Sequence, residues 1–291
     1  MSRPRRPTTT QIRRRRRVAL LVFTLLLALS TYLVLAATVF APVDDHGAEV
    51  ERLNVRSAAV DRTLGLAVVV PAKVPRRDER GLLVFLHGRG GSEESALGNE
   101  AVYSGLAKLG ARAPIVAFPD GGDHSYWHDR DEGRWGRYVM REAIPKLVRR
   151  YGIDPDRVAI GGISMGGYGA YNLALQHPRR FCAVGGHSAA LWFEAGETAP
   201  GAFDDASDFK RNDVVGAVRR DPDAFAGTRI WNDYGDQDPF RVYNEAFADY
   251  LRAGDADLSA HAWPGGHDGD YWNRHWPAYL RFYANSLANC D

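Results

Sequence analysis

Apolar runs alternate with polar, glycine-containing breaks along most of the chain. Short runs rich in aliphatic and aromatic residues predict β-strands at 64–70, 82–86, 114–118, 158–162, 181–186, 228–234 and 258–263. The run Leu82–Leu86 is apolar throughout, which is typical of a parallel strand buried on both faces. Helix-compatible segments separate these runs. The pattern therefore predicts an α/β fold, with a mostly parallel central sheet and helices on both of its faces.

One strand-to-helix junction carries a chemical signature. The strand predicted at 158–162 runs into Gly162-Ile163-Ser164-Met165-Gly166, and a helix-compatible segment follows from Tyr168 to Gln176. A G-x-S-x-G sequence in this context is typical of a nucleophile elbow, where the serine occupies a strained turn between small residues. The pattern predicts Ser164 as a catalytic nucleophile, and a glycine-rich structural turn is the alternative.

A serine nucleophile needs a histidine base, which in this arrangement comes last in the sequence. His267 lies in a glycine-rich loop after the strand predicted at 258–263, where it can reach the serine, and is the predicted base. His261 lies inside that strand and His275 lies on the following helix, so both suit packing better. His187 follows Ser164 too closely in sequence to be the usual base.

The acid that orients the base is predicted at the end of the strand at 228–234. Asp238 lies in the turn Gly235–Pro239, just before the proline, and is the preferred candidate. Asp236, which suits a turn cap, and Asp233, which lies inside the strand pattern, are the alternatives. The role of this acid is to hold the imidazole tautomer and stabilise the imidazolium.

The oxyanion hole is predicted to use two backbone N–H groups. One is that of Met165, directly after the nucleophile. The other is assigned to Arg89, with Gly88 as the alternative, in the glycine-rich loop after Leu82–Leu86. His87 is expected to support this loop. No metal or organic cofactor is implied, since the pair His124-x-x-x-His128 lies in a predicted loop.

Several longer stretches resemble a known family. The segment from Trp135 to Ser188, the sequence Pro119-Asp120-Gly121-Gly122 with Ser125-Tyr126-Trp127, and Gly265-Gly266-His267-Asp268 are similar to the putative esterase family. That family includes esterase D (S-formylglutathione hydrolase), feruloyl esterases and mycobacterial mycolyltransferases. The resemblance spans about residues 60 to 285 and implies an α/β-hydrolase fold that acts on acyl esters. The chain departs from it at His124 and in the charged run 128–132, where a less charged loop is expected.

The N-terminal segment has a different pattern. Five arginines, Arg13–Arg17, precede 23 uncharged residues, Val18–Phe40. As a helix these would extend about 34 Å, enough to cross a bilayer, and the arginines would stay in the cytoplasm. We expect a basic cytoplasmic tail at 1–17, a transmembrane signal-anchor at 18–40, a linker or first edge strand at 41–57 and the catalytic domain at 58–291. Cleavage near Ala37 or Pro42, giving a secreted protein, is the alternative.

The remaining features refine this picture. The net charge of +1 argues against a nucleic-acid partner. Cys182 and Cys290 are expected as free thiols, with a disulfide as the alternative. The stretch 194–210 is expected to be an insertion, either a lid or a surface loop. Aromatic residues that could line the site, or simply pack, are Tyr126, Trp127, Trp135, Trp192, Tyr271 and Trp272.

The sequence as a whole predicts a membrane-anchored, extracytoplasmic serine esterase with Ser164, Asp238 and His267 as its triad. Its expected partners are a small-molecule or cell-envelope ester, and the membrane through residues 18–40. Two alternatives are an acyltransferase, in which a sugar or lipid hydroxyl replaces water, and a catalytically silent cell-surface binding protein.

Overall fold

The computed structural model describes residues 18, 20–32, 43–74, 76 and 80–290, and the chain divides into two units, Met1–Val43 and Asp44–Asp291. In the first unit, residues 20–32 are helical and expose large apolar side chains such as Phe23 and Leu25. Within the described residues, no helix is long and apolar enough to span a membrane. The predicted tail at 1–17 and the part of the predicted anchor at 33–40 lie outside the described residues.

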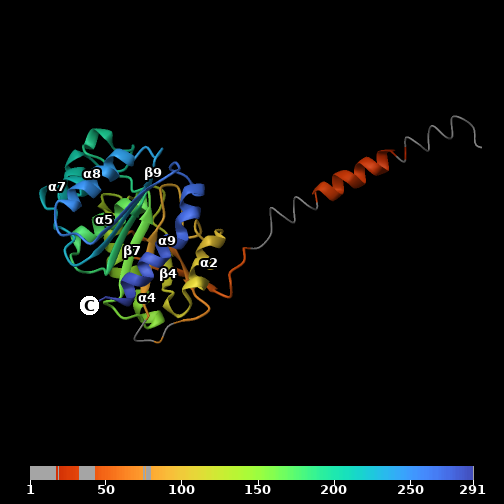
Figure 1. Ribbon diagram of the computed structural model, residues 1–291, viewed down its shortest axis with the longest axis horizontal. Helices are drawn as coiled ribbons and strands as arrows, with labels where there is room; N and C mark the ends of the chain where they lie inside the picture. Colours follow the sequence, from red (N-terminus) through yellow and green to blue (C-terminus); the bar gives the residue numbers. More distant parts are fainter. Residues whose placement is uncertain (1–17, 19, 33–42, 75, 77–79, 291) are drawn as a thin grey trace, which may run out of the picture. The chain divides into compact units, whose positions relative to one another are not determined.

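Within the described part of the second unit, eight strands form one sheet in the order β1-β2-β4-β3-β7-β8-β9-β10 (Figure 1). From β4 to β10 neighbouring strands run parallel, whereas β2 pairs antiparallel with both β1 and β4. The mostly parallel sheet is therefore confirmed. The strands are β1 Glu49–Ser57, β2 Arg62–Val70, β3 Leu82–Leu86, β4 Ile115–Pro119, β7 Val158–Ile163, β8 Ala183–His187, β9 Arg229–Gly235 and β10 Leu258–Trp263, and β5 Asp129–Arg130 pairs separately with β6 Gly133–Arg134.

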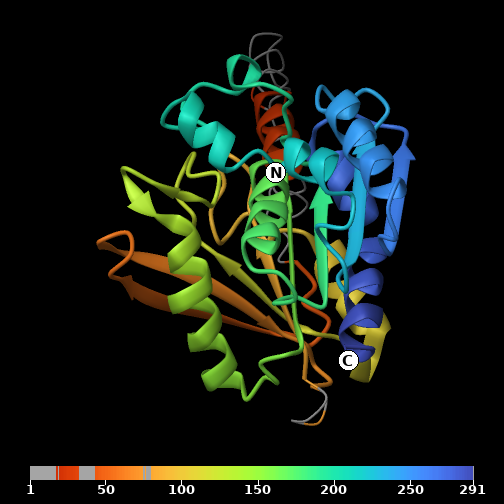
Figure 2. The same ribbon diagram turned by 90° about the vertical axis from the view of Figure 1, so that its left-hand side faces the viewer.

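Helices cover both faces of this sheet. One face carries α4, α5, α7 and α8, and the other carries α2 and α9 (Figure 2). The α-helices are α2 Glu100–Leu109, α3 Trp135–Arg137, α4 Ile144–Tyr151, α5 Met165–Gln176, α6 Ala206–Arg211, α7 Val214–Arg220, α8 Arg241–Arg252 and α9 Gly269–Ala288. The other helical segments are the 3₁₀ turns η2 Gly110–Arg112 and η4 Ala195–Glu197 and the π-helix η3 Tyr138–Ala143. Successive residues of β3 point to opposite faces, so Val84 packs in one core and Phe85 in the other. This two-sided burial explains why β3 is apolar at every position.

The sheet begins earlier than the domain boundary predicted at 58. Strand β1 lies within the stretch 41–57 and pairs with β2 along its whole length, from Glu49 opposite Val70 to Ser57 opposite Arg62. The edge-strand alternative is therefore confirmed. As an edge strand, β1 exposes every second or third side chain and carries several charged residues, so its sequence resembles that of a linker.

The prediction of two free thiols is wrong. Cys182 and Cys290 form a disulfide, with their Cα atoms 5.5 Å apart. Cys182 lies just before β8 and is only half-buried, so it is not sealed inside the strand. Helix α9 runs back along the sheet and brings Cys290 to the start of β8. The disulfide therefore fastens the carboxyl end of α9 to the sheet.

The charged run at 128–132 and the stretch 194–210 turn out to be complementary. The buried ring of His128 lies 2.9 Å from Asp208 of α6, and Arg130 donates to Asp204 at 3.0 Å. Arg130 also donates to the Gly201 carbonyl oxygen at 2.7 Å. The loop therefore departs from a less charged pattern because His128 and Arg130 form hydrogen bonds with the insertion.

Candidate active site

Ser164 lies on the sharp turn between β7 and α5. Its φ of 55° is unusual for a residue with a side chain, and such strained positions cluster at functional sites. The turn is held by hydrogen bonds of 3.0 Å from the Ser164 N–H to the His187 carbonyl oxygen and from the Ala190 N–H to the Ser164 carbonyl oxygen. A Cβ atom at Gly166 would overlap the Leu86 carbonyl group, which explains the small residue two positions after the serine.

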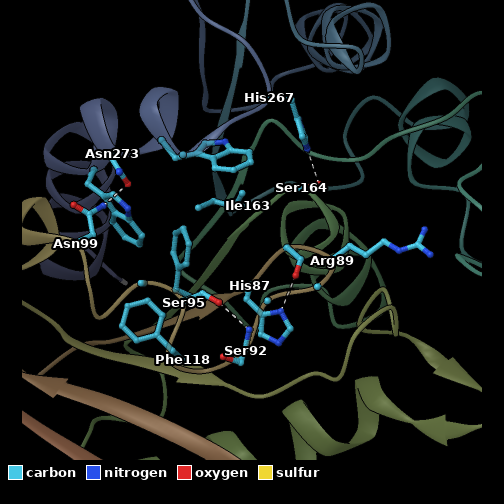
Figure 3. Close-up of a pocket in the computed structure, with 18 of the residues that line it drawn as sticks. His87, Arg89, Ser92, Ser95, Asn99, Phe118, Ile163, Ser164, His267 and Asn273 are labelled. Atoms are coloured by element: carbon cyan, nitrogen blue, oxygen red, sulfur yellow. Dashed lines mark hydrogen bonds between the residues drawn. The ribbon is translucent and has the colours of Figure 1, made fainter. Parts of the chain in front are cut away.

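Three loops bring the predicted nucleophile, base and acid together. His267 Nε2 lies 2.8 Å from Ser164 Oγ (Figure 3). On the other side of the ring, His267 Nδ1 lies 3.0 Å from Asp238 Oδ2. Asp238 follows β9 and His267 follows β10, and these two strands are parallel neighbours. The loops after parallel strands meet at one edge of the sheet, which is why residues so distant in sequence become adjacent.

The Asp238 carboxyl is buried and fixed by two hydrogen bonds. Burial by itself would raise its pKa, but the His267 ring and the Phe240 N–H, which donates at 2.7 Å, outweigh burial and lower the pKa below its ordinary value. The group is therefore an ionised acceptor. Because an ionised carboxylate can only accept, His267 Nδ1 carries the proton and leaves Nε2 as the acceptor facing Ser164.

The alternative acids have other partners. Asp236 Oδ1 accepts the Gly265 N–H at 3.1 Å and so joins the acid turn to the histidine loop. Asp233 is fully buried and lies 2.6 Å from the His187 ring. Neither carboxylate is hydrogen-bonded to His267 within the described residues.

The alternative bases pack against aromatic rings. His261 stacks on Trp263 with ring centroids 4.7 Å apart, and His275 stacks on the same indole at 4.0 Å. Burial lowers the pKa of both imidazoles. His187 contributes its backbone carbonyl to the elbow, while its ring bonds to Asp233. The packing roles expected for the first two residues agree with these contacts.

The backbone groups predicted for the oxyanion hole flank Ser164. Met165 is the first residue of α5, so its N–H has no acceptor within the helix. In the loop after β3, Gly90 and Gly91 donate to Asp123 and Gly88, whereas the Arg89 N–H makes no such hydrogen bond in the described part of the chain. Gly88 lies against the elbow, and a Cβ atom there would be 3.4 Å from Ser164 Cβ.

His87 supports this loop, as expected. Its Nε2 accepts the Gly121 N–H at 2.9 Å, which places the proton on Nδ1 for the 2.8 Å hydrogen bond to the Gly88 carbonyl oxygen. Burial lowers the pKa of His87, which keeps the ring neutral in this arrangement. The ring therefore links the loop after β3 to the loop after β4.

A pocket of about 630 Å³ opens beside Ser164 (Figure 3). Its floor is formed by Phe85, Phe118, Ile163 and Trp276 from β3, β4, β7 and α9. The loop from Ser92 to Asn99 and the first turns of α9 form its walls. It is also lined by Arg89, Tyr126, Ala199 and Phe240, of which Arg89 is exposed. Through Ala199, the insertion at 194–210 contributes one residue to the pocket.

Two of the six aromatic residues suggested for the site, Tyr126 and Trp272, line this pocket. Sequence reasoning missed two pocket residues, Asn99 and Asn273, whose side chains are joined at 2.6 Å. An asparagine before a helix is a recognisable N-cap, and Asn99 does cap α2. No sequence signal links it to a residue 174 positions away.

Comparisons with known proteins identify the family of this chain. A family model described as "Putative esterase" matches residues 57–283. An acetyl esterase of Caldicellulosiruptor saccharolyticus is 24% identical over 253 residues, 77% of this chain and 94% of that protein. The MPT51 antigen of Mycobacterium leprae (strain TN) is 33% identical over 90 residues, 30% of each protein. The structure of a ferulic acid esterase aligns with a TM-score of 0.71 at 22% identity, over 82% of this chain and 98% of that one, which shows an α/β-hydrolase-like fold.

Proposed function

Because the chain belongs to the putative esterase family and is a serine hydrolase of carboxylic esters, we propose that it works through an acyl-enzyme on Ser164. The observation that carries this proposal is the 2.8 Å contact between Ser164 Oγ and His267 Nε2, with Asp238 on the other ring nitrogen. A nucleophile, a base and an orienting acid in this geometry are the parts that acyl transfer needs.

In the first half of the reaction, Ser164 Oγ attacks the ester carbonyl carbon and its proton passes to His267 Nε2. The N–H groups of Met165 and Arg89 stabilise the negative charge that develops on the carbonyl oxygen. The bond to the alcohol then breaks, and the alcohol leaves with the proton held by His267. Asp238 stabilises the imidazolium throughout without taking its proton.

In the second half, water replaces the alcohol. His267 takes a proton from water, whose oxygen attacks the acyl carbon, and the same donors stabilise the second oxyanion. The carboxylic acid departs and the proton returns to Ser164 Oγ. If the hydroxyl of a sugar or lipid attacked in place of water, that hydroxyl would receive the acyl group and the enzyme would be an acyltransferase. The experiment below therefore includes such acceptors.

We further propose that the hydrolase unit acts outside the cytoplasm, held by residues 18–40. Two observations support this location. The uncharged run Val18–Phe40 follows five arginines, and the helix at 20–32 exposes its apolar side chains. The Cys182–Cys290 disulfide is typical of proteins in oxidising compartments. The substrate class is then a small-molecule or cell-envelope ester.

The test compares full-length wild-type protein in mild detergent with Ser164→Ala and with Ser207→Ala. Ser207 is an exposed serine of α6 and serves as the matched control. We expect Ser164→Ala to lose several orders of magnitude in turnover of simple esters and all labelling by an organophosphonate, while Ser207→Ala keeps both. Added sugar or glycerolipid acceptors that divert the acyl group from water would favour the transferase. A Ser164→Ala enzyme with a tenth of wild-type turnover would overturn the acyl-enzyme proposal.

A further inference from the structure

The pocket lies beside two helices that share one face of the sheet. Helices α2 and α9 pack against each other at Gly105, where a Cβ atom would lie 2.7 Å from Leu280 Cδ1 and 3.8 Å from the Pro277 backbone. Near the amino-terminal ends of the two helices, Phe85, Phe118 and Trp276 line the space that continues from Ser164. We call this space the slot. It is apolar at its base and runs from Ser164 to the amino-terminal end of α2.

One hydrogen bond closes the far end of the slot. Asn99 Nδ2 donates to Asn273 Oδ1 at 2.6 Å, which joins the N-cap of α2 to the second turn of α9. The orientation of the Asn99 amide is fixed, because its Oδ1 accepts the Ala101 N–H at 3.0 Å and its nitrogen must then face α9. Figure 3 shows this pair at one end of the pocket, Ser164 at the other and Ile163 between them.

We propose that the slot holds the acyl group of the ester and that the Asn99–Asn273 pair limits the length of acyl group that the enzyme accepts. This inference rests on the acyl-enzyme function proposed above. The preferred substrates are esters of apolar carboxylic acids that end before the pair. A longer acyl chain must break the 2.6 Å hydrogen bond and force its end past two amides.

The assignment of the slot to the acyl group rests on the hydrogen bond that spans its far end. The acyl group stays bonded to Ser164 until water attacks, whereas the alcohol must leave after the first half of the reaction. No such hydrogen bond between side chains spans the part of the pocket lined by Arg89, Ala199 and Phe240 among the described residues, and Arg89 is exposed there. We therefore assign this part to the departing alcohol and the slot to the acyl group.

Two variants remove the hydrogen bond in different ways. Asn273→Ala shortens an exposed side chain of α9 and opens the slot directly. Asn99→Ser removes the donor but keeps a residue that caps a helix well, so α2 keeps its N-cap. The matched control is Asn285→Ala, which removes a 3.0 Å hydrogen bond from Arg112 to another exposed asparagine of α9, away from the pocket.

The experiment measures kcat/KM of the full-length proteins on p-nitrophenyl esters from acetyl to dodecanoyl. A second series has an acetyl group and alcohols of increasing length. We expect the ratio of decanoyl to butyryl kcat/KM to rise by about tenfold or more in Asn273→Ala and Asn99→Ser, and to stay at the wild-type value in Asn285→Ala. The alcohol series should give the same profile in all four proteins.

An unchanged acyl profile in both variants, or an equal change in Asn285→Ala, would overturn the role of the pair. A change confined to the alcohol series would overturn the assignment of the slot. Ser164→Ala, measured alongside, separates these failures from a failure of the proposed function. If that variant is inactive, only the length limit is wrong, whereas retained activity removes the acyl-enzyme on which it rests.

Discussion

The ring of His187 lies 2.6 Å from a carboxylate oxygen of Asp233, and this buried histidine–aspartate pair is distinct from His267–Asp238 and from His128–Asp208. Both side chains are fully buried. The Asp233 carboxylate also accepts hydrogen bonds of 2.6 to 2.9 Å from Trp231, Tyr271 and Tyr279. Two of these donors belong to α9. The pair therefore has no route to a substrate and instead fastens the pocket wall to the sheet.

We predict that Asp233→Asn lowers the free energy of unfolding by about 3 kcal/mol, because one acceptor oxygen becomes an amide that faces buried donors. Tyr279→Phe removes one donor and should cost about 1 to 2 kcal/mol. Urea unfolding followed by tryptophan fluorescence measures both. If Asp233→Asn lowered the free energy of unfolding by less than about 0.5 kcal/mol, the hydrogen bonds to Asp233 would contribute little to stability.

The predicted acid of the triad, Asp238, can be distinguished experimentally from its neighbour in the same turn, Asp236. Asp238→Asn should lower kcat by about 10⁴, because an amide no longer holds the His267 tautomer. Asp236→Asn keeps an oxygen that accepts the Gly265 N–H, so its kcat should stay within about threefold of wild type. Steady-state kinetics on one ester decides between them, and the reverse order of effects would assign the acid to Asp236.

The lowered pKa of Asp238 makes stability depend on pH. Because the folded pKa lies below the unfolded value of about 3.9, the unfolded chain binds the extra proton first as pH falls. The stability that the carboxylate contributes is thus fully present well above pH 4 and is lost as pH falls through the folded pKa. Urea unfolding at a series of pH values measures the difference in free energy of unfolding between wild type and Asp238→Asn. This difference should become smaller below about pH 4. If wild type instead became more stable relative to Asp238→Asn as the pH fell, the pKa of Asp238 could not be lowered in the folded protein.

The disulfide should stabilise the hydrolase unit. Cys182 and Cys290 are 108 residues apart, and closing a loop of this length restricts the unfolded chain by an amount that corresponds to about 2 to 5 kcal/mol. The double variant Cys182→Ser/Cys290→Ser should unfold at lower urea concentration than wild type. Reduced wild type should unfold at the same urea concentration as the double variant, since neither protein has the disulfide. Equal midpoints for oxidised and reduced wild type would show that the bond does not form in solution.

Much of this structure can be predicted from short stretches of the sequence. The strand runs and the elbow around Ser164 are read from neighbouring residues, and His267 and Asp238 follow from their places after strands β10 and β9. The catalytic roles of these residues remain predictions, although the structure brings their side chains together.

The contacts that sequence reasoning missed all join distant segments. Asn99 meets Asn273 only because α2 and α9 pack side by side, and Tyr271 and Tyr279 reach Asp233 because α9 packs on β9. The same reason explains the wrong thiol prediction, since Cys290 follows a helix whose path the sequence does not fix. Strand β1 resembled a linker because an edge strand keeps many polar side chains.

The separation of 103 residues between Ser164 and His267 bears on when activity appears during synthesis. A growing chain contains the strand, turn and helix of the elbow long before β10 and α9 emerge from the ribosome. At that stage the serine has no base, the slot has only one helical wall, and the carboxylate of Asp233 lacks the phenols of α9. We therefore expect a truncated or half-folded chain to lack hydrolytic activity, which would begin only when the last helix docks.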